Sequence, residues 1–209
     1  LPWQKKLNLD QNIPILGWWR YFRSCVCENW KMPSRNLVNE LVLAILLPLA
    51  FWQLGTEKFL ASVVFIFLLN IIFLTDLDLF IIPDKVSLIG TGLGLVLSAI
   101  ETPGLPNIKQ ALAGGFFGFL LTFGINYLYF LNRGREGMGF GDVKLTAMLG
   151  IWLGPISLLP ILFSASLAGA LFGFGKASFI KNRTSLGLAR VPFGCFLALA
   201  GLAWYLSAP

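Results

Sequence analysis

Two aspartates in this chain lie where they could carry out acid–base chemistry at a membrane boundary. Asp76 lies in TDLDLFIIPD and Asp142 lies in GMGFGD, each at the edge of a long apolar run. A carboxylate in or beside a membrane is costly and marks a functional site by default. Two carboxylates a few ångströms apart share one proton, so one can act as a base on water while the other polarises a peptide carbonyl. The pair predicts an aspartyl dyad.

The chain lacks the residues for most other hydrolytic mechanisms, because it has no histidine. This rules out a Ser–His pair, a Cys–His pair and an HExxH zinc site. Cys25 and Cys27 could give two zinc thiolates, but a structural zinc site takes four ligands, and no second cysteine pair lies near them. We therefore expect plain thiols, no bound metal and no cofactor requirement for proteolysis.

The two motifs hold further polar residues and glycines. Asp78 is a candidate supporting residue, whereas Asp84 is expected to cap a helix that begins at Lys85, in a polar turn between two helices. In GMGFGD, alternate glycines would allow unusual backbone angles and close approach of an extended peptide. The alternative is a flexible loop that ends in Asp142 as a helix N-cap. The loop lacks the GK[ST] ending of a phosphate-binding loop.

The composition places these motifs in a membrane protein. The chain has 209 residues, of which 56% are hydrophobic and 12% charged, whereas soluble domains carry about 25% charged residues. No segment shows the alternation of a membrane barrel, so we expect an all-α polytopic helix bundle. Residues 1–37 would form a basic cytoplasmic segment and residues 38–209 a transmembrane catalytic bundle. Seven spans are expected, at about 38–55, 58–75, 85–100, 109–131, 143–155, 156–175 and 191–207.

The basic residues indicate how these spans are oriented. With alternating spans, fourteen of the 16 lysines and arginines fall on one side, and Lys58 and Lys109 fall on the other. Short cytoplasmic loops are enriched in such residues, so the basic side is expected to be cytoplasmic. Asp76 and Asp142 both fall on that side. The net charge of +6 is thereby explained by topology, and no nucleic-acid partner is expected.

The motifs TDLDLFIIPD and GMGFGDVKLTAMLG together resemble the type IV prepilin peptidases, which are bacterial GxGD aspartyl proteases. The stretches NIPILGWW and VPFGCFLALAG also look like family segments, so the resemblance covers nearly the whole chain. It implies that Asp76 and Asp142 are the catalytic pair. Gly139 and Gly141 match the motif glycines, and Lys144 matches the lysine that follows the aspartate. The opening Leu-Pro resembles residues after the family's first span, which implies eight spans in an intact protein.

The resemblance also implies a function. Family members cleave the basic leader from prepilins or pseudopilins at the cytoplasmic face of the bacterial inner membrane. Many then methylate the new N-terminus with S-adenosylmethionine. The family's cytoplasmic loop often carries two CxxC pairs that can hold zinc. Here one pair is absent and the other is compressed to Cys25-Val-Cys27, which makes zinc unexpected and leaves the methyltransferase activity open.

Two other functions compete with the peptidase. A small transporter or proton relay would also use membrane carboxylates, but its coupling residues usually lie near the midplane. A structural subunit of a secretion machine would explain the hydrophobicity but not the paired aspartate motifs. The sequence leaves open whether a pilin or a secretion pseudopilin is the substrate.

Overall fold

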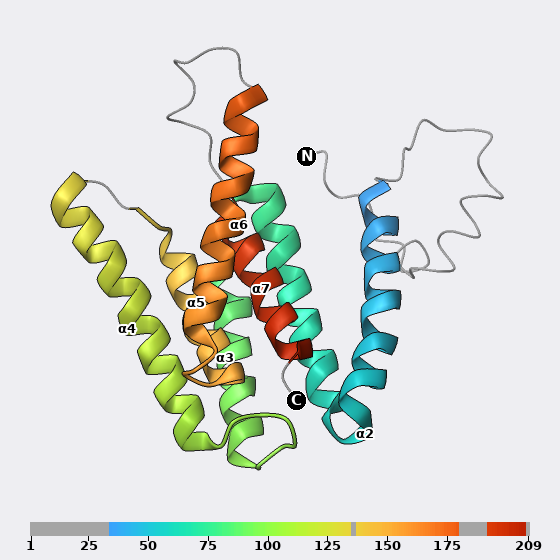
Figure 1. The fold of residues 1–209 in the computed structure, drawn as a ribbon. Coiled ribbons are helices and arrows are strands. Elements are labelled where there is room, and N and C mark those ends of the chain that lie inside the picture. Colours follow the sequence, from blue (N-terminus) through green and yellow to red (C-terminus); the bar gives the residue numbers. More distant parts are fainter. Residues whose placement is uncertain (1–33, 135–136, 180–191, 208–209) are drawn as a thin grey trace, which may run out of the picture. The chain divides into compact units, whose positions relative to one another are not determined.

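In the residues that its structure, a computed structural model, describes, the chain forms helices joined by short turns and loops. The described residues are 34–134, 137–179 and 192–207. Figure 1 shows the helices in sequence order. They are α2 (Ser34–Leu79), α3 (Asp84–Ala99), α4 (Ile108–Arg133), α5 (Phe140–Leu153), α6 (Leu158–Phe179) and α7 (Phe193–Ser207). The prediction of an all-α membrane bundle is confirmed, whereas Cys25 and Cys27 lie outside the described residues.

The seven expected spans all coincide with helical segments. The first two form the two parts of α2, which meet at Gly55, where φ is 73° and ψ is 177°. The chain divides into two compact units, Leu1–Pro48 and Leu49–Pro209. The packing below lies within the second unit.

The number of membrane crossings is not confirmed by helix length. Among the described residues, three helices are long and apolar enough to cross, at Asn39–Leu79, Ile108–Arg133 and Leu158–Gly175. Phe193–Ser207 is a shorter apolar helix. The helices α3 and α5 have 16 and 14 residues, fewer than the roughly 20 that cover a hydrocarbon core.

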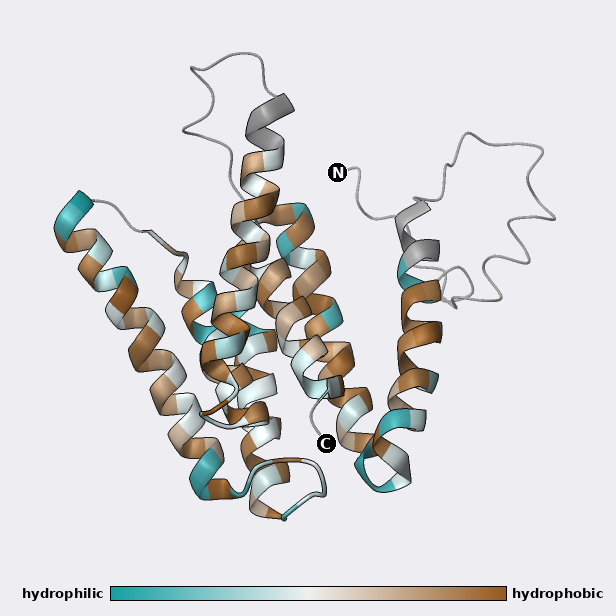
Figure 2. Cartoon of the chain, viewed as in Figure 1, coloured by the Kyte–Doolittle hydropathy of each residue, from teal (hydrophilic) through white to brown (hydrophobic). Residues whose placement is uncertain are grey.

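Apolar side chains cover the outer faces of the helices as well as the inner ones. Figure 2 shows hydrophobic residues along most of α4 and α6, with hydrophilic residues gathered at the ends of α4. In the apolar window of α4 only 28% of residues are buried, and in that of α6 only 22%. Phe116 and Phe163 are 70% and 71% exposed. A helix that is hydrophobic all round is typical of a lipid environment.

The central helix of the second unit is α5, which contacts α3, α4, α6 and α7. Its residues Leu145, Met148 and Trp152 are fully buried. The Trp152 Nε1–H donates a 2.8 Å hydrogen bond to the backbone oxygen of Gly90 in α3. The Phe65 ring of α2 stacks on Trp152 with a centroid distance of 4.9 Å. These contacts fix α5 against its neighbours.

Small residues let α4 and α5 approach each other closely. A Cβ added at Gly114 would collide with the backbone oxygen of Gly150, and one at Gly118 would lie 2.8 Å from the backbone oxygen of Thr146. Glycines at such a contact allow two membrane helices to touch backbone to backbone. The N-terminal end of α5, which carries Asp142, is therefore held in a fixed place in the bundle.

Candidate active site

Asp76 lies in the last turn of α2 and is almost completely buried, with 5% of its surface exposed. The helix ends where Phe80 adopts a left-handed conformation, with a φ of 53°. The Phe80 N–H still donates a 3.0 Å hydrogen bond to the Asp76 backbone oxygen. This bond satisfies a carbonyl at the helix end and leaves the Asp76 side chain directed into the bundle.

The N-terminus of α7 holds the Asp76 carboxylate. The backbone N–H of Cys195 donates a 2.8 Å hydrogen bond to Asp76 Oδ2. The Cys195 thiol lies 3.2 Å from the Phe73 backbone oxygen, one turn earlier in α2. The first N–H groups of a helix have no partner within the helix, and the helix dipole favours negative charge there. The contact suits an ionised carboxylate.

Gly194 allows this approach because it has no side chain. A Cβ added there would lie 2.9 Å from Asp76 Oδ2 and 2.8 Å from Ile82 Cδ1. Both contacts are tighter than ordinary van der Waals packing. The close contact of Gly194 is therefore with Asp76 itself.

Asp142 lies in the first turn of α5, just before the predicted span 143–155, and its side chain is half-buried. Burial, and after it the negative charge of Asp76, raise its pKa from 3.8 to about 7, although a hydrogen bond from the Gly139 backbone acts in the opposite direction. The acid is therefore protonated up to about neutral pH. This bond back to Gly139, the N-cap residue, follows the geometry of a capping box.

The two aspartates meet although 65 residues separate them in the chain. The negative charge of Asp76 raises the pKa of Asp142. The side chain of Ile82 lies beside Gly141, next to Asp142, and beside Gly194, which contacts Asp76. A Cβ at Gly141 would lie 3.0 Å from Ile82 Cβ, and the Ile82 Cδ1 also borders Gly194. Ile82 is 7% exposed. The ends of α2, α5 and α7 thus enclose one carboxylate suited to charge and one suited to a proton.

The predicted supporting residues Asp78 and Lys144 are less buried than Ile82. Asp78 is exposed at the end of α2. Lys144 Nζ lies 2.8 Å from Asp84 Oδ1 and 4.8 Å from the centre of the Phe140 ring. Lys144 thus pairs with an acid outside the dyad.

Two predictions about these motifs were wrong. Asp84 is not an N-cap: α3 begins at Asp84, Pro83 occupies the cap position and no side-chain cap bond forms. The glycines of GMGFGD do not adopt unusual backbone angles, because none of the three has a positive φ. Gly141 approaches Ile82 and Gly137 approaches the Tyr129 ring, so both glycines accommodate side chains of this chain. The alternative that made Asp142 an N-cap fails as well, since α5 begins two residues earlier.

Within the described ranges no group of three or more acidic, cysteine or histidine residues could hold a metal. The prediction about zinc concerned Cys25 and Cys27, which lie outside those ranges. Sequence reasoning did not find the role of Cys195. Its contribution is a backbone N–H, which carries no side-chain signal, and the only pointer was the glycine before it.

Comparison with known proteins agrees with this geometry. Residues 63–174, which include both aspartates, match the Type IV leader peptidase family. The chain is 32% identical to a prepilin leader peptidase/N-methyltransferase of Aeromonas salmonicida, over 94% of this chain and 70% of the relative. It is 33% identical to one of Pseudomonas putida, over 94% and 67%. It is 30% identical to one of Dichelobacter nodosus, over 96% and 68%.

No solved structure matches the chain. The family match spans more than half of the chain and contains the ends of α2 and α5 that form the acidic site. The relatives extend the similarity over almost all of the remainder. The chain therefore belongs to the type IV leader peptidase family.

Proposed function

We propose that this chain is a membrane aspartyl endopeptidase that removes the basic leader of a prepilin or pseudopilin, with Asp76 and Asp142 as its catalytic residues. The observation that carries the proposal is the difference between the two carboxyl groups. Asp76 accepts a hydrogen bond from the α7 N-terminus, whereas the pKa of Asp142 is raised to about 7. A carboxylate held by a helix N-terminus beside an acid that keeps its proton can supply a base and an acid at one pH.

We assign a role to each aspartate from its surroundings. Asp76, as the ionised carboxylate, takes a proton from a water molecule while the water oxygen attacks the carbonyl carbon of the scissile peptide. Asp142, as the neutral acid, gives its proton to the carbonyl oxygen. When the carbon–nitrogen bond breaks, the proton held by Asp76 passes to the leaving amine. The proton on the tetrahedral intermediate's hydroxyl returns to Asp142, which restores the starting state.

The positions of the acids support a peptidase over a transporter or proton relay. Coupling acids of transporters usually lie near the midplane of the membrane. Asp76 lies in the last turn of α2, and Asp142 lies in the first turn of α5. A site at helix ends can receive a soluble leader from the membrane surface. We place this surface at the cytoplasm, because fourteen of the 16 basic residues fall on that side.

We give Gly139, Gly141 and Asp78 supporting roles around the dyad, with Lys144 acting through its pair with Asp84. The relatives' names also include N-methyltransferase. That reaction would use S-adenosylmethionine as the methyl donor. No residue that the structure describes can be assigned to that donor, and we restrict the proposal to peptide cleavage.

The test is cleavage of a synthetic prepilin-like peptide by the protein purified in detergent. Wild type should shorten the peptide at one bond. Asp142→Asn should stop cleavage, because an amide keeps the shape of the acid but cannot supply its proton. Glu57→Gln is the matched control, since Glu57 is an exposed acid of α2 that lies 19 residues before Asp76, and this variant should cleave at close to the wild-type rate. Near-normal cleavage by Asp142→Asn would reject the proposal.

A further inference from the structure

A pocket lies at the end of the bundle away from the two aspartates. It has a volume of about 310 Å³ and is lined by residues from α2, the α3–α4 loop and the C-terminal ends of α5 and α7. Each of these helices carries a dyad residue or its partner at the other end. Along α2, a rise of about 1.5 Å per residue puts Lys58 about 27 Å from Asp76. This is close to the thickness of about 30 Å of a hydrocarbon core.

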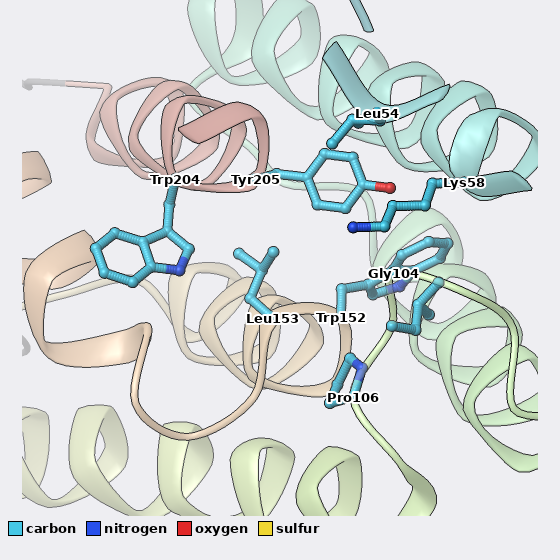
Figure 3. Close-up of a pocket in the computed structure, with 9 residues that line it drawn as sticks. Leu54, Lys58, Gly104, Pro106, Trp152, Leu153, Trp204 and Tyr205 are labelled. Carbon is cyan, nitrogen blue, oxygen red and sulfur yellow. The ribbon is translucent and has the colours of Figure 1, made fainter. Parts of the chain in front are cut away.

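Aromatic rings and one ammonium group face this space. Figure 3 shows Lys58 extending across the pocket, with its nitrogen turned toward Tyr205 and Leu153, and with Trp152 and Trp204 forming walls. The described residues include no carboxylate within ion-pair distance of Lys58. A cation beside buried rings, without an internal counter-ion, favours an anionic ligand.

The backbone around Lys58 is built to hold its side chain in place. Gly104 has a φ of +87°, and a Cβ added there would lie 2.7 Å from Lys58 Cδ. The stem of the lysine therefore packs directly on the α3–α4 loop. Tyr205 is fixed in turn by a 2.9 Å hydrogen bond between its hydroxyl and Ser62 Oγ. The direction of the ammonium group is set by packing.

The region beside the pocket is suited to lipid. Trp52 is 86% exposed and Ile156 is 85% exposed, and in sequence they lie two and three residues from the lining residues Leu54 and Leu153. Tryptophan and tyrosine are enriched where membrane helices meet the headgroup layer. The volume has room for a headgroup but not for a whole phospholipid, whose acyl chains would lie along the apolar outer faces.

We propose that this pocket binds the phosphate of an anionic phospholipid headgroup, with Lys58 as its cationic partner. The site is independent of peptide cleavage, since it uses neither aspartate. It would fix the depth of the bundle in the membrane at the end opposite the acidic site. A soluble phosphate compound offers the same chemistry without acyl chains, so the two sources can be separated experimentally.

Native mass spectrometry of the protein in neutral detergent tests this proposal, with phosphatidylglycerol titrated as the probe. Wild type should retain one phosphatidylglycerol in preference to phosphatidylcholine. Lys58→Gln should weaken that retention by about fivefold, which is the contribution of one lysine near a lipid surface. Lys58→Arg should restore it. Lys109→Gln is the matched control, because Lys109 is an exposed lysine of the first turn of α4 and does not line the pocket.

Four results would overturn the proposal, and the last of them concerns a soluble phosphate. One is equal retention by wild type and Lys58→Gln. Another is an equal loss in Lys58→Gln and Lys109→Gln, which would show general surface charge. The third is equal retention of phosphatidylcholine. Competition by glycerol phosphate at millimolar concentration would overturn the lipid assignment and place a soluble phosphate in the site. Peptide cleavage by Lys58→Gln should stay at the wild-type rate.

Discussion

Replacing Gly194 by alanine should impair peptide cleavage by displacing Asp76. The added Cβ would lie 2.9 Å from Asp76 Oδ2 and 2.8 Å from Ile82 Cδ1. Because packed atoms rest about 3.5 Å apart, the carboxylate must shift by about half an ångström. The shift would strain its 2.8 Å hydrogen bond from the Cys195 N–H. A misplacement of about 1 Å costs on the order of 100-fold in rate, so we expect a kcat lower by about 10- to 100-fold.

The same substitution has a stability cost that must be measured separately. An extra methyl group in a packed interior typically costs about 1–3 kcal/mol. Thermal unfolding in detergent and size-exclusion elution would show whether the variant is folded at the assay temperature. The KM should change little, because the displaced group acts on the bond and not on the leader.

Gly92→Ala is the matched control for this experiment. Gly92 lies inside α3, and a Cβ added there would meet nothing within 4 Å. Alanine in an open helical position is neutral or slightly stabilising, so kcat should stay at the wild-type value. A Gly194→Ala variant that is folded and has an unchanged kcat would refute the role of the α7 N-terminus in positioning Asp76.

Three further predictions concern the proton, the ion pair and the core. Because the pKa of Asp142 is raised from 3.8 to about 7, the folded protein holds a proton between these pH values that the unfolded chain has released. The free energy of unfolding should therefore fall as the pH rises from about 4 to about 7. Thermal melts of Asp142→Asn should lose this dependence on pH. In the wild type, the cleavage rate should decline above about pH 7. Lys144→Met should change the free energy of unfolding by less than about 1 kcal/mol, because its partner Asp84 is 62% exposed; a larger change in thermal unfolding would contradict this. Trp152→Phe should lower stability by about 1–3 kcal/mol in the same assay, since it removes the donor to Gly90; an unchanged melt would contradict it.

The apolar runs predicted the helices well, because a membrane span is encoded by local composition. Helix ends were harder to place. Asp84 was expected as a cap, yet Pro83 occupies that position and the Asp84 carboxylate pairs with Lys144 on another helix. Capping rules consider only residues near each other in the chain, so they cannot predict this tertiary contact between α3 and α5. The count of crossings also depends on short helices, since α3 and α5 are shorter than a typical span.

The sequence predicted which residues form the acidic site, but not which of the two aspartates carries the proton. The motifs and the charge pattern of the loops put Asp76 and Asp142 on one side, and the structure brings them together. Nothing in the sequence indicated which acid would carry the proton. That difference comes first from the burial of the Asp142 side chain, while Asp76 is held by the Cys195 N–H, a backbone group 119 residues away. Because almost every residue has such a group, only the folded chain shows which one is used.

A double-mutant cycle on peptide cleavage tests most directly whether Asp76 and Asp142 act as one unit. The rates of Asp76→Asn, Asp142→Asn and the double variant would be compared with wild type in detergent, with unfolding temperatures confirming that all four are folded. Groups that share one proton act together, so each single loss should be about as large as the double loss. Losses that multiply, or a single variant that cleaves at a near-normal rate, would contradict the dyad.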